Sequence, residues 1–266
     1  MSESKQRWRI VFARDDDARF LSHLDAIHLW ERAFRRGEIP VAMSEGFSPR
    51  PRLIFAAPLP LGMLAEHELA DVFLAERLTR LDLRERLADG MPRGYRLIDL
   101  RDEWVGGPAL ATRLVAADYR MTLLGVAADP LEGATRRLMA ASSLRREKRR
   151  EKKVTEYDLR PLLIDMEVRP SDPTAGATDA PETAAAVLWM RLRNSQDLGS
   201  GRADEVVAAV ADELGMAAIA APGSGESEGE QVTGPDGSTE PSNERPALEM
   251  VRPVRERLWL VDELAP

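Results

Sequence analysis

The chain has 266 residues and no cysteine. A disulfide, a thiolate zinc site and a cysteine-ligated iron–sulfur cluster are therefore excluded within it. Histidine is scarce, with three residues, and no apolar run approaches the length of a membrane span. The first residues, Met1 to Arg7, are polar and do not resemble an export signal. We expect a soluble, cytoplasmic protein with no cofactor and no metal site of its own.

The net charge of −8 is spread unevenly along the chain. Residues 136–153 contain nine Lys or Arg against two Glu, whereas residues 171–249 contain four Arg against fifteen Asp or Glu. Blocks of opposite sign indicate segments with different partners. Within the acidic block, residues 221–247 are rich in Gly, Ser, Glu and Pro, a composition that cannot bury enough apolar surface to fold. We predict a disordered acidic loop there and a shorter loop at residues 171–183.

Apolar periodicity predicts the elements of the first half. Trp8, Ile10 and Phe12 fall on alternate positions, which is typical of a strand with one buried face. Ser22 and Asp25 form a capping-box pattern that opens a helix. The expected strands are residues 8–12, 46–61, 69–74 and 95–100, and the expected helices are residues 22–36 and 81–89.

The second half repeats this order of elements. Its expected strands are residues 119–124, 155–168, 187–193 and about 258–260, and its expected helices are residues 131–149 and 206–214. Two consecutive βαββαβ units predict an α+β fold of two tandem ferredoxin-like units. The predicted domains are residues 1–104 and residues 112–266, with the acidic loop inserted in the second.

A proline-rich segment follows the first predicted helix. Residues 44–62 contain four prolines and two arginines in a stretch that otherwise reads as a strand. Arg50 and Arg52 stand two apart, so they project from one side of an extended chain, and Phe47 adds an aromatic ring. This combination is suited to gripping phosphates or a nucleotide backbone. The alternative is an irregular edge strand whose prolines and charges only prevent aggregation.

Two later strands carry tryptophan beside arginine. Trp189 and Arg191 fall on one face of the first of these strands. Trp259 shares a face of the last strand with Arg255 and Arg257. In a ferredoxin-like unit the helices leave one sheet face open, where rings can stack on unpaired RNA bases and cations can bind phosphate. The alternative is that these faces pack against the other half of the protein.

The basic run provides a second candidate surface for nucleic acid. It begins at Arg145 and Arg146 and continues through Arg149 and Arg150, at the end of a predicted helix. Such a concentration of cations is suited to a polyanion. The alternative is a solvated helix C-terminus, where cations also interact favourably with the helix dipole.

His23 is the candidate catalytic residue of the chain. It is the second residue of the predicted capping box, on the helix side that carries the apolar residues. We interpret it as a packing residue with one satisfied nitrogen. The alternative is a general acid or base, alone or with His28. The two histidines are five residues apart, which does not place two metal ligands on one helix face.

Several segments resemble a known bacterial family. They are Ser22-His23-Leu24-Asp25, Ser44-x-Gly46-Phe47-x-Pro49-x-Pro51, Pro58-Leu59-Pro60-Leu61-Gly62 and Asp158-Leu159-Arg160-Pro161-Leu162-Leu163. The family they resemble is the radical-SAM-associated family of unknown function, found as separate proteins or as C-terminal extensions of cobalamin-binding radical S-adenosylmethionine proteins. The resemblance implies that this chain accompanies a radical-SAM enzyme. Without cysteine, any radical reaction takes place on that partner.

Three functions follow as hypotheses. The first is a non-catalytic RNA-binding accessory protein that works with a radical-SAM enzyme in RNA modification or processing. The second is an endoribonuclease, by analogy with tandem ferredoxin-like endoribonucleases, in which His23 or His28 acts on the RNA. The third is a purely protein–protein adaptor, in which the acidic loop and the basic run dock the partner.

Overall fold

The computed structural model describes residues 4–45, 47–150, 153–170, 185–195, 197–219 and 246–264, without the side chains of residues 148–150 and 153. The predicted loop at 171–183 and residues 221–245 of the predicted acidic loop lie outside the described residues. No helix in the described part of the chain is long and apolar enough to cross a membrane.

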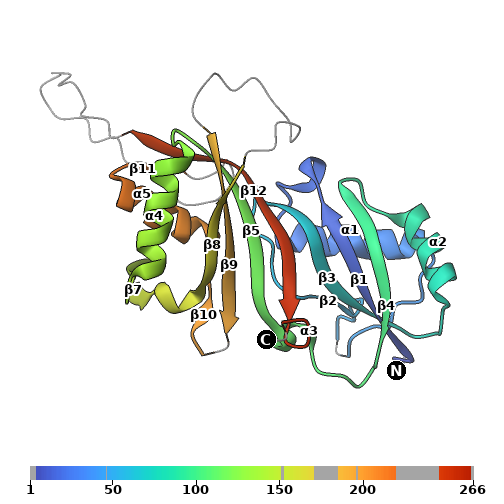
Figure 1. Cartoon of the computed structure of the whole chain (residues 1–266). Helices are drawn as coiled ribbons and strands as arrows, with labels where there is room; N and C mark the ends of the chain where they lie inside the picture. The colour runs from blue at the N-terminus through green and yellow to red at the C-terminus, as the bar shows by residue number, and fades with distance from the viewer. Residues whose placement is uncertain are drawn as a thin grey trace, which may run out of the picture.

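The described residues form one ten-stranded, mostly antiparallel sheet, a separate two-stranded hairpin and five α-helices (Figure 1). The first half contains β1 (Gln6–Arg14), α1 (His23–Arg36), β2 (Leu53–Phe55), β3 (Leu64–Leu74), α2 (Arg80–Gly90) and β4 (Tyr95–Glu103). The linker contains α3 (Leu110–Arg113). The second half contains β5 (Leu114–Leu124), α4 (Ala128–Ala140), β6 (Arg145–Arg150), β7 (Lys153–Asp158), β8 (Leu163–Arg169), β9 (Ala185–Ser195), β10 (Gly199–Ser200), α5 (Ala203–Leu214), β11 (Ala217–Ile219) and β12 (Ala247–Leu260). The prediction of an α+β fold is confirmed.

Each half has the same order of paired strands. In the first half the neighbours are β4, β1, β3 and β2, and in the second half they are β12, β5, β9 and β8, all antiparallel. A short parallel pairing joins the halves, with Val254 opposite Leu64 and Arg255 opposite Ala65. β2 and β12 therefore share the same edge of β3, and the sheet continues from one half into the other.

The start of α1 shows why the local sequence folds as predicted. The Ser22 side chain accepts a hydrogen bond from the Asp25 main-chain N–H at 3.1 Å, which satisfies one of the free N–H groups of the first turn. Trp30 and Phe34 then lie on one buried face of the helix. The Trp30 ring packs against Phe12 of β1, with 5.1 Å between ring centroids. The predicted helix at 22–36 is confirmed.

The basic run is a strand, so the prediction of a helix over residues 131–149 is wrong at its end. α4 stops at Ala140, and β6 pairs with β7 in an antiparallel hairpin. The Leu144 N–H donates to the Asp158 carboxylate at 2.7 Å where the hairpin begins. Lys, Arg and Glu are good helix formers, but the helix propensities of ordinary residues differ by less than about 1 kcal/mol per residue, so pairing with a neighbouring segment overrides them. The expected strand 155–168 is likewise interrupted, by a 3-10 turn at Arg160–Leu162.

Only a small part of the expected strand at 46–61 pairs in the sheet. β2 covers Leu53–Phe55, and the prolines on both sides of it deny the chain further ladder hydrogen bonds. Residues 56–63 then run between the two halves before β3 begins. This short segment forms part of the site described next.

Candidate functional site

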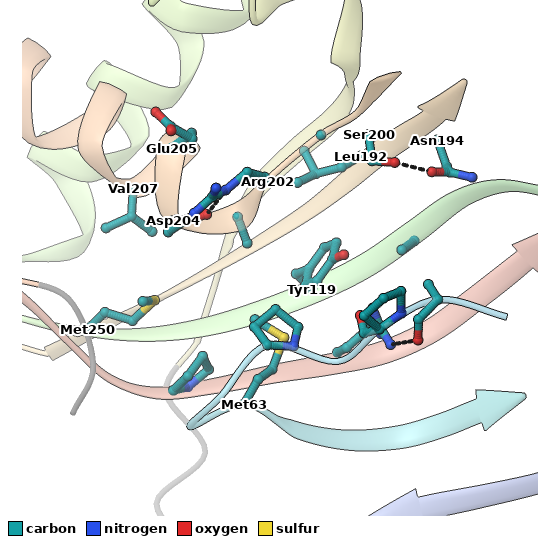
Figure 2. A pocket seen from close by; sticks show the side chains of 18 of the residues that line it. Met63, Tyr119, Leu192, Asn194, Ser200, Arg202, Asp204, Glu205, Val207 and Met250 are labelled. Carbon is teal, nitrogen blue, oxygen red and sulfur yellow. Dashed lines mark hydrogen bonds and ion pairs between the residues drawn. The ribbon is translucent and has the colours of Figure 1, made fainter. Parts of the chain in front are cut away.

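A cavity of about 810 Å³, here called the junction cavity, lies where the two halves meet (Figure 2). Residues 57–63 form one of its walls, and the beginning of α5 forms another. Strands β5, β9 and β12, with the short strands β10 and β11, contribute the remaining lining. The side chains of Met63, Leu192, Val207 and Met250 line it, so most of its surface is apolar (Figure 2).

A buried ion pair lies beside this cavity and connects the two halves. Arg255 of β12 donates from Nε to the Glu68 carboxylate of β3 at 2.6 Å, and each side chain is 3% exposed. Burial alone would lower the pKa of Arg255, but Glu68 and a hydrogen bond with Tyr119 of β5 raise it. The guanidinium therefore stays charged. Its remaining N–H groups donate to the main-chain carbonyls of Ala57 and Pro58, at 3.3 and 3.1 Å.

A second buried cation holds the same segment from the first half. Arg14, at 3% exposed, donates to the carbonyls of Pro60 and Met63 at 2.8 and 2.7 Å. Burial lowers the pKa of Arg14, and the neighbouring Tyr95 and Glu68 partly offset this. With Arg255, two guanidinium groups thus hold four carbonyl oxygens of residues 57–63. Buried charges of this kind fix the position of a main chain that has no strand to hold it.

His23 lies near this network but is not oriented for catalysis. It lines a small pocket together with Arg14, Glu68 and Tyr95. The ring packs edge-on against Phe55, with 5.5 Å between centroids, and burial lowers the pKa of His23, so the imidazole is neutral at pH 7. Among the described residues neither ring nitrogen has a hydrogen-bond partner, so no group sets its tautomer. The predicted hydrogen bond to one nitrogen is therefore absent from the described part of the chain, and His23 is an exposed residue whose ring packs against Phe55.

The tryptophan and arginine residues of the open sheet face contact one another. The Arg191 guanidinium lies over the rings of both Trp189 and Trp259, at 5.4 and 4.6 Å from their centroids. Arg257 lies over Trp259 at 3.9 Å, and Arg169 lies over Trp189 at 4.4 Å. We call these five side chains the Trp–Arg ladder. Its ring faces are already in contact with cations of the chain itself.

Carboxylates compensate much of the charge of the Trp–Arg ladder. Arg191 forms two hydrogen bonds with Asp118, at 2.7 and 2.9 Å. Glu256 accepts a hydrogen bond from the Trp189 indole at 3.1 Å and lies 3.4 Å from Arg169. The predicted nucleic-acid residues Trp189, Arg191 and Trp259 do lie together. Trp189 is buried, at 6% exposed, so its ring is not open to a base, and the buried Trp259 indole N–H has no hydrogen-bond partner among the described residues.

Arg255 lies on the opposite side of β12 from the rest of this group. The pairing of β12 with β5 shifts between Arg255 and Arg257, so Arg255 stands opposite Tyr119, while Arg257 stands opposite Asp118. The prediction that Arg255 shares a face with Trp259 is therefore wrong. A β-bulge of this kind reverses the alternation of side chains and leaves no clear mark in a single sequence.

The proline-rich loop after α1 presents two of its three predicted residues to solvent. Phe47 is fully exposed, at 110% relative accessibility, and Arg50 is exposed with no ion pair among the described residues. Arg52 is different, because its guanidinium lies 4.1 Å from the centroid of the Phe73 ring and donates to Ser4 at 2.6 Å. The loop offers one ring and one unpaired cation.

The basic hairpin is only partly described. Arg145 is exposed, whereas Arg146 forms an ion pair with Asp212 of α5. Arg149 and Arg150 belong to β6, and their side chains lie outside the described residues. The structure places the hairpin beside α5 and does not place it in the junction cavity.

Sequence reasoning missed the residues that build the junction cavity. Glu68 and Arg255 are 187 residues apart, and Arg14 was not singled out from the other arginines. The one available signal was the pattern Pro58-Leu59-Pro60-Leu61-Gly62, which lies within the segment that both cations hold. In the part of the chain that is described, no three His, Asp or Glu side chains gather as a metal ion would need.

Comparisons with known proteins identify the family and little more. No curated protein matches the chain at a significant level. A solved structure of an unknown protein from Galdieria sulphuraria is 15% identical over 79% of this chain and 94% of that one, with a TM-score of 0.23. A score this low supports no argument about fold or function. The model of a family described as uncharacterized proteins conserved in bacteria (DUF2344) matches residues 7–198. The chain belongs to this family.

Proposed function

We propose that the protein is an RNA-binding accessory protein that works in the cytoplasm with a separate radical-SAM enzyme, in RNA modification or processing. Within this proposal the fold is a pair of ferredoxin-like units. The strand order β4-β1-β3-β2 and its counterpart β12-β5-β9-β8 support that part, because a βαββαβ chain in this order is the ferredoxin-like arrangement.

Phe47, with its ring fully exposed, and Arg50 three residues later, exposed and without an ion pair among the described residues, are the observation that carries the proposal. Large aromatic side chains are seldom left wholly in water on a surface without a binding role. An exposed ring can stack on an unpaired base, and a nearby cation can bind the adjacent phosphate. The Trp–Arg ladder is a weaker candidate for base stacking, because its rings already contact guanidinium groups.

Binding is favoured over catalysis by two features of the chain. His23 has no hydrogen-bonding partner among the described residues, and a general acid or base is normally oriented by one. The chain also lacks the cysteines that a radical-SAM cluster requires. The partner would therefore supply the chemistry, and this protein would hold the RNA.

Filter binding to total RNA at two salt concentrations tests the proposal. Phe47→Ala should weaken binding at least about fivefold at both salts, because stacking on one base contributes about 1–3 kcal/mol. Arg50→Ala should weaken binding and also reduce its salt dependence. The matched controls are Phe20→Ala, which removes another exposed ring, and Arg84→Ala, which removes an exposed cation of α2.

Two outcomes would contradict this function. Absence of saturable binding by the wild-type protein at low salt would remove RNA as the ligand. Equal losses of RNA affinity in the Phe47→Ala and Phe20→Ala variants would show that the proline-rich loop after α1 is not the RNA-binding site. If RNA binding is absent and the radical-SAM protein still co-purifies from RNase-treated lysate, the protein is a protein–protein adaptor and not an RNA-binding protein.

A further inference from the structure

We propose that the junction cavity is a binding site for an uncharged, mostly apolar small molecule. This inference is independent of the RNA proposal, since none of the loop residues Phe47, Arg50 and Arg52 lines the cavity. The argument rests on the size of the cavity, the balance of charge around it and the way its wall is held.

The size and the lining are those of a small-molecule site. Ligand pockets commonly enclose about 300–1,000 Å³ and are lined mainly by apolar side chains with a few polar groups. The junction cavity has about 810 Å³, with Met63, Leu192, Val207 and Met250 on its surface (Figure 2). Tyr119 provides a polar group among them (Figure 2). Removing the apolar lining of the cavity from water is favourable, so an apolar ligand that covers it would gain binding free energy.

The charged groups around the cavity are already compensated within the chain. Arg202 donates to Asp204 at 3.1 Å (Figure 2). Burial and a hydrogen bond to Glu205 raise the pKa of Tyr157 to about 12, so Glu205 also has a partner. Arg193 donates to the main-chain carbonyl of Pro161 at 3.2 Å. A charged ligand would lose its hydration without gaining an unpaired countercharge, which favours an uncharged one.

The wall formed by residues 57–63 is held before any ligand arrives. Arg255 and Arg14 bind its carbonyls from two sides, and both cations are buried. A connection between two strands does not by itself require two buried guanidinium groups. Holding a wall in place in advance reduces the entropy lost on binding, so it favours ligand affinity.

A pair of related dyes provides the test. N-phenylnaphthylamine is uncharged, and anilinonaphthalene sulfonate adds one negative charge to the same apolar body. We expect the uncharged dye to bind the full chain at one site per molecule, with a dissociation constant at least tenfold lower than that of the sulfonate. Fluorescence titration measures both constants, because each dye brightens in apolar surroundings.

A cavity-filling variant locates the site. Ala208 of α5 lines the cavity and is half-buried, so Ala208→Phe should occupy part of it without disturbing the core. We expect at least a tenfold loss of affinity for N-phenylnaphthylamine. Ala88→Phe makes the same change at an exposed position of α2 and should leave the affinity unchanged. Thermal unfolding of both variants establishes that each remains folded.

Each part of the inference can fail separately. Unchanged dye affinity in a folded Ala208→Phe variant would overturn the junction cavity as the site. Equal or tighter binding of the sulfonate would overturn the uncharged ligand class. Phe47→Ala should bind N-phenylnaphthylamine as the wild type does, so failure of RNA binding and failure of dye binding are distinguishable.

Discussion

Two of the arginine-rich regions of the molecule differ in their surroundings. Beside the junction cavity, Arg255 and Glu68 are buried and pair with little access to water. In the Trp–Arg ladder, Arg169 is 37% exposed and Arg191 is 25% exposed, although both also pair with carboxylates. An arginine–carboxylate pair therefore affects stability differently in the two regions. Removing one partner of a buried pair lowers the free energy of unfolding more, because the remaining buried charge cannot be hydrated by water instead.

Removing the buried carboxylate should have the largest effect. Glu68→Gln leaves Arg255 without its countercharge, so the free energy of unfolding should fall by about 3–5 kcal/mol. Urea denaturation measures this change. Glu66→Gln is the matched control, because Glu66 is exposed and pairs with the partly exposed Arg120, so we expect a change of about 0–1 kcal/mol. Similar losses in the two variants would contradict the difference between buried and exposed pairs.

A smaller effect is expected in the Trp–Arg ladder. Arg191→Gln removes two contacts with tryptophan rings and the ion pair with Asp118, whose side chain is 8% exposed against 25% for Arg191, so stability should fall by about 1–3 kcal/mol. The loss should shrink in high salt, because solvent screens the ion pair. Arg193→Gln, on the same face of β9 and with no ion pair among the described residues, should change stability little. An Arg191 variant as damaging as Glu68→Gln would show that exposure does not separate the two regions.

The smallest expected effect is on the free energy of unfolding at acid pH, through Asp158. The main-chain N–H groups of Leu144 and Arg160 lower the pKa of Asp158, whose carboxylate accepts hydrogen bonds from both. The stabilisation is therefore present above the unfolded-state pKa of about 3.9 and is lost as pH falls through the lower folded-state value.

Asp158→Asn should accordingly flatten the loss of stability below about pH 4. Urea denaturation across the acid range measures the slope. Asp89→Asn makes the same change of charge at an exposed position of α2 and controls for net charge. Equal flattening in both variants would contradict a specific role for the Asp158 hydrogen bonds.

Sequence patterns correctly predicted the helices and strands that depend on contacts between residues close together in the chain. The Ser22 cap, the apolar stripe of α1 and the alternation in β1 all describe neighbours within a few turns or residues. The order of elements in the first half followed from them, whereas the second half also contains the hairpin of β6 and β7 and the short strands β10 and β11, which were not predicted. The basic run was misjudged because pairing with β7 outweighs the helical propensity of its residues.

The junction cavity could not be predicted in the same way. It depends on contacts between segments far apart, such as Glu68 with Arg255. It also depends on a shift in the pairing of β12, which turns Arg255 away from Arg257 and Trp259. Neither feature has a periodic signature. For the exposed loop, the sequence predicted Phe47 and Arg50 as surface residues, while the stacking of Arg52 on Phe73 required the fold.

The parallel pairing of β12 with β3 has a consequence for synthesis on the ribosome. β12 covers part of the edge of β3 next to Leu64 and Ala65, yet the residues that pair there, Val254 and Arg255, are translated 190 positions later. Until they emerge, that part of the edge has unpaired main-chain groups, which can template association with another nascent chain. The protein is therefore most vulnerable to aggregation while its first half is complete and its last strand is still unmade.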